Sequence, residues 1–167
     1  MGIRERLAER LERLAHLVPG IGSYQDKEER RDADKRLRMT LADRLDTARK
    51  AVEDVISSLQ SQGHLEHLDR LGRLERKLHQ AADSIRFASY GYSAVFDAIK
   101  IDEAKLDRLY AFDIALAESV SAVQDAAGRL KAAPAEAIAA DALEPLEQQI
   151  AAFNAKVQER MALFREG

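Results

Sequence analysis

The stretch from Pro19 to Arg38 reads PGIGSYQDKEERRDADKRLR, and it separates a short first helix from a long second one. Proline removes a backbone donor and disfavours helix at the residue before it, so a preceding helix should end at Pro19-Gly20. Acidic residues then gather where the positive end of a new helix dipole would lie, which predicts a helix start near Gln25 or Asp26. The stretch therefore predicts consecutive helices joined by a Gly-rich connection.

Apolar residues recur at steps of three and four along nearly the whole chain, which is typical of amphipathic helices. Gly63 is placed to end the second helix with a left-handed cap, and Asp102 and Asp141 are placed to cap the fourth and fifth. Nothing in the pattern suggests a strand. Five helices are expected, at residues 1–18, about 26–62, about 64–99, 103 to about 131, and about 142–164.

The composition favours a helical bundle. Hydrophobic residues make up 46% of the chain but aromatics only 5%, so the core must be built from Leu, Ala, Val and Ile. Short connections imply that successive helices run antiparallel. We expect one all-α domain over residues 1–167: an elongated antiparallel up-and-down four-helix bundle (26–167), a connection (19–25) and an additional short N-terminal helix (1–18). That helix should pack on the end or flank of the bundle, or on a neighbouring molecule.

Several classes of function are disfavoured by the composition. The chain has no cysteine, which excludes disulfides, thiolate metal sites and thiol nucleophiles. Its 26 basic and 29 acidic residues give a net charge of −3, which argues against sequence-independent nucleic-acid binding. No apolar run of about 18 residues or signal-peptide pattern is present, so a cytoplasmic protein is expected. The first helix carries four arginines but also three glutamates, so we expect it to pack on protein rather than on a membrane.

The charged run from Lys27 to Arg38 contains more charge than a solvated helix start needs. Three pairs are spaced four residues apart: Asp34–Arg38 is attractive, whereas Glu28–Asp32 and Arg31–Lys35 bring like charges together. Such like-charge pairs suggest partners elsewhere, on the fifth helix, the first helix or another molecule.

A second unusual stretch, Arg86 to Lys100, holds four of the nine aromatic residues: Phe87, Tyr90, Tyr92 and Phe96. We favour the interpretation that these side chains fill a wide part of the core while Gly91 allows another helix to approach. The alternative is a ligand pocket that offers the hydroxyl groups of Tyr90 and Tyr92.

Folding the helices back at their connections predicts that the unusual residues meet at one end of the bundle. The charged run, the Tyr90–Tyr92 segment, Asp113 and Arg160 come level there, and Tyr24 lies at the same end. Asp113 stands between two apolar residues on the widest apolar face, and a buried carboxylate is costly unless paired. Its candidate partners are Arg86, Arg31 and Arg38. We favour a structural ion pair that sets the helix register.

Motifs for metal binding and catalysis are weak in this chain. His64 and His67 lie one helical turn apart and are candidate ligands for Zn or Ni, but two ligands do not make a site, and we favour a polar helix start. The sequence contains no Glu-x-x-His, Walker loop, G-x-G-x-x-G, G-x-S-x-G or H-E-x-x-H. We therefore expect no catalytic residues and no cofactor.

The pattern PG-x-G-x-Y-x-x-K-E-x-R-R-x-x-D-K-x-L-R at Pro19–Arg38, followed by S-Y-G-Y-x-x-x-F-D at Ser89–Asp97, resembles a small family of uncharacterised bacterial all-helical proteins. The resemblance implies a bacterial, cytosolic helical protein and carries over no activity. Phage-shock-type membrane-remodelling proteins are also helical hairpins, but the hairpin arms here are shorter and the first helix is more balanced in charge.

Three functions follow as hypotheses. The first is a non-enzymatic interaction or scaffold module that self-associates, or binds another protein, through the Tyr24–Arg38 end. The second is a bundle that binds a small anionic ligand or a metal, and the third is a peripheral membrane-stress accessory protein. The candidate interaction or ligand residues are Tyr24, Arg30, Arg31, Asp34, Arg38, Arg86, Tyr90, Tyr92 and Asp113.

Overall fold

The chain is all-α in a computed structural model, which describes residues 2–21, 27–88 and 102–165. No strand occurs within these ranges. The α-helices are α1 (Ile3–Leu17), α2 (Lys27–Ser61), α3 (Leu68–Arg86), α5 (Glu103–Ala132) and α6 (Ala140–Arg165), and a 3₁₀ turn, η1 (Ala135–Ala137), precedes α6. The predicted all-α class is confirmed.

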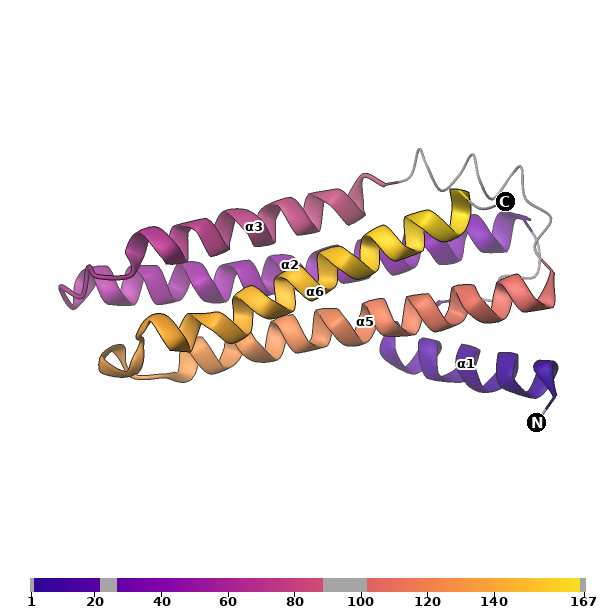
Figure 1. The fold of residues 1–167 in the computed structure, drawn as a ribbon, viewed down its shortest axis with the longest axis horizontal. Helices are drawn as coiled ribbons and strands as arrows, with labels where there is room; N and C mark the ends of the chain where they lie inside the picture. Colours follow the sequence, from indigo (N-terminus) through magenta and orange to yellow (C-terminus); the bar gives the residue numbers. More distant parts are fainter. Residues whose placement is uncertain (1, 22–26, 89–101, 166–167) are drawn as a thin grey trace.

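The helices pack against one another along the long axis of the molecule (Figure 1). Helix α2 contacts α3 and α5, and α6 contacts α5 and α3. Each of these helices turns an apolar stripe inward, so that leucines such as Leu37, Leu45, Leu78 and Leu116 are almost completely buried. None of the described helices has the length and apolar content needed to cross a bilayer.

Helix α1 lies on the flank of α5 (Figure 1). Leu14 and Val18 are fully buried at its C-terminal end, while Leu7 and Leu11 are partly buried further out. Arginines along α1 pair with carboxylates of α5, as in Arg10 Nη1 to Asp107 Oδ1 at 3.3 Å. The other pairs of this contact are Arg4–Glu103, Arg6–Asp107 and Arg13–Glu118. The expectation that this helix packs on protein is confirmed, and its place is the flank.

Two predicted helix caps are present. Asp102 Oδ1 accepts a hydrogen bond from the backbone N–H of Lys105 at 2.8 Å, which satisfies a donor that the first turn of α5 leaves open. Gly63 has φ of +77°, and the N–H of His64 after it bonds to the carbonyl of Leu59 at 2.9 Å. This bond closes the end of α2 in the way expected of a left-handed glycine cap.

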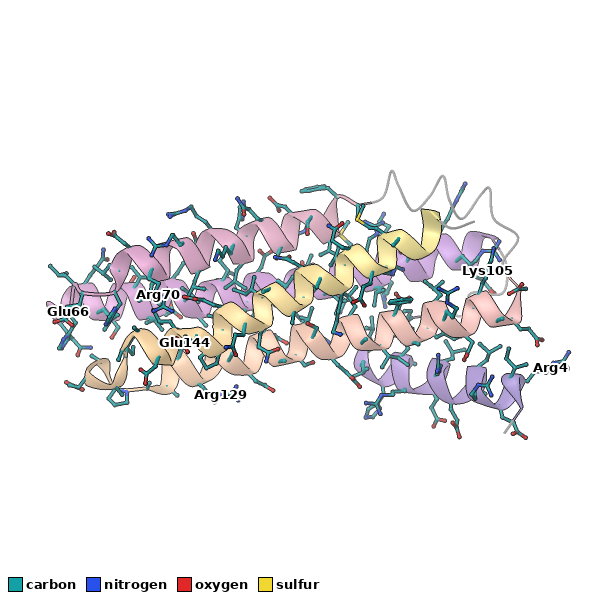
Figure 2. The ribbon with its side chains drawn as sticks, viewed as in Figure 1. Arg4, Glu66, Arg70, Lys105, Arg129 and Glu144 are labelled. Carbon is teal, nitrogen blue, oxygen red and sulfur yellow. The ribbon has the colours of Figure 1, made fainter. Side chains whose placement is uncertain are left out.

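Three predicted helix boundaries differ from the structure. The third helix begins at Leu68 rather than near His64, because the hydrogen bonds that close α2 extend to the N–H of His64 and residues 64–67 then connect α2 to α3, where Figure 2 shows Glu66. It ends at Arg86, and the rest of the predicted helix, residues 89–99, lies outside the described residues. Helix α6 begins at Ala140, so Asp141 stands in its first turn instead of capping it.

At the end of the molecule near the α2–α3 turn, an ion pair joins α3 to α6. Arg70 Nε donates to Glu147 Oε1 at 2.5 Å, and Figure 2 shows Arg70 on the side of α3 that faces α6. This hydrogen bond lowers the pKa of Glu147, and partial burial opposes the shift. A carboxylate whose pKa is lowered by folding contributes stability above its unfolded pKa, and that contribution is lost as the pH falls through the folded pKa.

We therefore expect Glu147→Gln to flatten the acid side of the stability curve. Urea unfolding at a series of pH values below neutral should show a smaller loss of unfolding free energy per pH unit in Glu147→Gln than in the unaltered chain. Glu136→Gln, which removes an exposed carboxylate of η1, is the control and should leave the curve unchanged. Equal slopes for all three chains would show that the Arg70–Glu147 pair does not couple folding to pH.

Substituting alanine should change the stability of the protein in opposite directions at two glycines. Gly63 has a positive φ with open space around it, so Gly63→Ala should cost about 1–2 kcal/mol through backbone strain alone. Gly128 lies inside α5 with no atom within 4 Å of an added Cβ, so Gly128→Ala should stabilise the protein by about 0.5–1 kcal/mol. Denaturant unfolding measures both, and equal signs would contradict the assigned cap.

Candidate functional site

Four charged side chains are buried together between the helices. Asp34 and Arg38 come from α2, Asp113 from α5 and Arg160 from α6, and each is at most 4% exposed. We call these four residues the buried ion quartet. Two carboxylates and two guanidinium groups give the quartet no net charge, which is the condition under which charged groups are tolerated in a protein interior.

Arg160 connects the three helices of the quartet. Its Nε donates to Asp113 Oδ1 at 2.6 Å, and its Nη2 donates to Asp34 Oδ1 at 2.8 Å. The side chain is only 1% exposed and is among the largest fully buried side chains described. Because the planar guanidinium presents its donors in a fixed geometry, bonding both carboxylates at once restricts how α6 sits against α2 and α5.

Arg38 extends the network to α3. Its Nε donates to Asp34 Oδ2 at 2.8 Å, as the sequence spacing predicted, and its Nη1 donates to the carbonyl of Arg86 at 2.8 Å. The carbonyl of Ile85 is 3.5 Å from the same nitrogen. The last carbonyls of a helix have no partner within the helix, so Arg38 serves as a C-terminal cap for α3 supplied by α2.

The side chain of Arg86 returns the contact from α3 to α2. Its Nη2 lies 2.6 Å from Asp46 Oδ2 and 3.2 Å from Asp43 Oδ1. The hydrogen bond to Asp46 is the largest cause of a raised pKa at Arg86. The two arginines therefore connect α2 and α3 in both directions: Arg38 of α2 bonds the backbone of α3, and Arg86 of α3 bonds Asp43 and Asp46 of α2.

The predicted convergence of Asp34, Arg38, Asp113 and Arg160 is present in the structure. The predicted partners of Asp113 were Arg86, Arg31 and Arg38, and two of these arginines bond other carboxylates. Arg38 bonds Asp34, and Arg86 pairs with α2 because its position in the last turn of α3 places it over Asp46 and Asp43. Arg160, which the register placed at this end but which was not among the candidate site residues, bonds Asp113 instead.

A signal for Arg160 was available in the sequence. It stands seven residues after Phe153 and three after Val157, both of which are buried in the apolar stripe of α6. An arginine on that stripe must find a buried acceptor, and Asp113 offered one. The other candidates are dispersed or undescribed: Arg30 is half-buried and Arg31 is exposed, while Tyr24, Tyr90 and Tyr92 lie outside the described residues.

The two candidate metal ligands do not form a site. His64 is exposed and His67 is half-buried in the turn between α2 and α3, where they precede α3 rather than share its first turn. Across the ranges that the structure describes, no group of three or more His, Cys, Asp or Glu side chains is arranged to hold a metal ion.

A hollow of about 580 Å³ lies outside the quartet, on the other side of α2. We call it the outer groove, and its lining includes Gly20, Glu29, Asp32, Lys35, Arg36 and Met39. Asp32, Lys35 and Arg36 are exposed, in contrast to Asp34 and Arg38 on the inward face of the same turns. Gly20 has φ of +84°, and a Cβ atom added there would collide with the guanidinium of Arg36. Gly20, just after the end of α1, thus lies directly against α2.

Comparison with known proteins does not assign this chain to a family. No protein-family model, no curated protein and no solved structure matches the chain. The site must therefore be interpreted from its own chemistry. That chemistry consists of carboxylates and guanidinium groups that satisfy one another.

Removing one member of the quartet should lower the free energy of unfolding much more than removing two oppositely charged members together. Arg160→Leu takes a buried guanidinium away from Asp113 and Asp34, and should cost about 3–5 kcal/mol of unfolding free energy. The double variant Arg160→Leu/Asp113→Leu removes opposite charges together and leaves Asp34 with Arg38, so it should recover part of that loss. Urea denaturation at neutral pH measures both.

Arg13→Leu is the matched control for this prediction. Its partner Glu118 is exposed, so the same substitution there should cost less than about 1 kcal/mol. If Arg160→Leu lowered the free energy of unfolding no more than Arg13→Leu, the buried ion quartet would not be a structural constraint.

Proposed function

We propose that the chain is a non-enzymatic protein–protein interaction or scaffold module that self-associates through the α2 end, residues 24–38. The observation that carries this proposal is the division of charge across α2. The inward groups, Asp34 and Arg38, are bonded to other helices of the same chain, whereas Asp32, Lys35 and Arg36 are exposed around a groove. The buried groups stabilise the fold, and the exposed ones are available for recognition.

The proposed architecture is an antiparallel up-and-down four-helix bundle with α1 on its flank. Ion pairs between α2 and α3 support it: Asp46 bonds Arg86, while Arg49, later in α2, bonds Glu75, earlier in α3. Residue numbers that run in opposite directions along a contact are those of an antiparallel pair. Rigid elements of this kind, locked by a buried network, suit a scaffold that presents a surface without changing shape.

The alternative of an anionic-ligand site has less support. Arginines attract an anion when their charge is not already compensated, but Arg38 and Arg160 are bonded to Asp34 and Asp113 in a space nearly closed to solvent. A ligand would have to displace these carboxylates and compete with bonds of 2.6–2.8 Å. The quartet is thus better suited to holding helices than to binding a solute.

Sedimentation velocity over a range of protein concentrations tests the proposal. We expect the unaltered chain to form a dimer as the concentration rises, and Arg30→Glu/Arg31→Glu to shift the equilibrium toward monomer because it reverses two charges at the α2 end. Arg73→Glu/Arg76→Glu, on exposed positions of α3, is the matched control and should leave the equilibrium unchanged. Circular dichroism verifies that each variant is folded. A monomer at every concentration would refute self-association.

A further inference from the structure

The charges around the outer groove follow an order along α2. Glu29 and Asp32 lie one turn apart and are acidic, and Lys35 and Arg36 in the next turn are basic. Ala33 lies between the two groups at the base of the groove and is 2% exposed, and Met39 adds an apolar contact beyond the basic turn. The groove therefore has an acidic half and a basic half on the same helix.

Three of these charges have no ion-pair partner among the described residues. Asp32 and Arg36 stand four residues apart in the orientation that favours an ion pair, yet the guanidinium of Arg36 is directed to Gly20. No residue in the described ranges forms an ion pair with Asp32, Lys35 or Arg36. Further along α2, by contrast, Asp46, Arg49 and Asp54 all have partners.

We propose that the outer groove binds a second copy of this chain, with the two α2 helices antiparallel about a two-fold axis that passes near Ala33. This inference rests on the self-association proposed above and specifies its geometry. In this arrangement Asp32 of one copy faces Lys35 of the other, and Glu29 faces Arg36. The two pairs have their midpoints at 33.5 and 32.5 in residue number, a difference of about 1.5 Å along a helix, so one axis serves both.

Charge order favours a second copy over other partners. A two-fold axis places the same patch of each copy against itself, which is unfavourable for a patch of one sign and favourable for an acidic half next to a basic half. A nucleic acid or an anionic lipid surface would match the basic half and be repelled by the acidic half. Complementary charge across such an interface fixes its register and rejects other partners.

Charge exchange between copies tests the pairing. In Asp32→Lys the groove carries Lys at both 32 and 35, so both 32–35 pairs repel, and in Lys35→Asp both positions are acidic and these pairs repel as well. Each variant alone should dimerise at least about tenfold more weakly than the unaltered chain in sedimentation equilibrium at low salt. An equimolar mixture of the two should form a heterodimer, because each facing pair is then attractive. The double variant Asp32→Lys/Lys35→Asp should dimerise like the unaltered chain.

Lys50→Asp supplies the matched control, because it reverses an exposed charge on the same helix about four turns from the groove. It should leave the dimerisation constant unchanged. If the unaltered chain dimerises but Asp32→Lys and Lys35→Asp dimerise equally well, the groove is not the interface, although self-association stands. If both variants are weakened but their mixture stays monomeric, the two-fold pairing is wrong. If the unaltered chain is monomeric, both proposals fail.

Discussion

The bond of Arg160 to both Asp113 and Asp34 is the constraint on which the arrangement of the long helices depends. Apolar stripes made of leucine and alanine pack in several registers at similar free energy, because one methyl group replaces another with little loss. A buried guanidinium between two carboxylates has no such freedom, since a shift of one turn would leave a charge without its partner. The quartet thus selects one register of α2, α5 and α6 among the many that the apolar pattern permits.

The same network determines where α3 ends. Arg38 bonds the last carbonyls of α3, and Arg86 reaches back to Asp46 and Asp43, so the C-terminal turn of α3 is attached to α2 at two points. Through Asp34, this attachment is continuous with Arg160 and therefore with α5 and α6. One hydrogen-bonded system therefore includes the end of α3, the α2–α3 contact and the packing of α6. Removing a side chain from one part should destabilise the other parts as well.

This internal use of charge bears on function. The first turns of α2 carry charge on two sides, and the inward side is neutralised by the quartet. Outward, the same turns line a groove with an acidic and a basic half beside Gly20. Helix α1 meanwhile uses its arginines on carboxylates of α5, which keeps its basic side chains occupied. Together these features support the proposal of a module that recognises a surface of matching charge order rather than a small solute.

The sequence by itself determined the all-α class, most helix boundaries and the approach of Asp34, Arg38, Asp113 and Arg160 to one another. These features follow from local properties of the sequence, namely the helical spacing of apolar residues, the caps at Gly63 and Asp102, and the lengths of the helices. Only the tertiary structure decided that Arg160 is the partner of Asp113, that Arg86 binds α2, and that α3 ends at Arg86. These outcomes depend on which side chain reaches which acceptor on another helix, and the spacing of residues along the sequence does not specify the distances between helices.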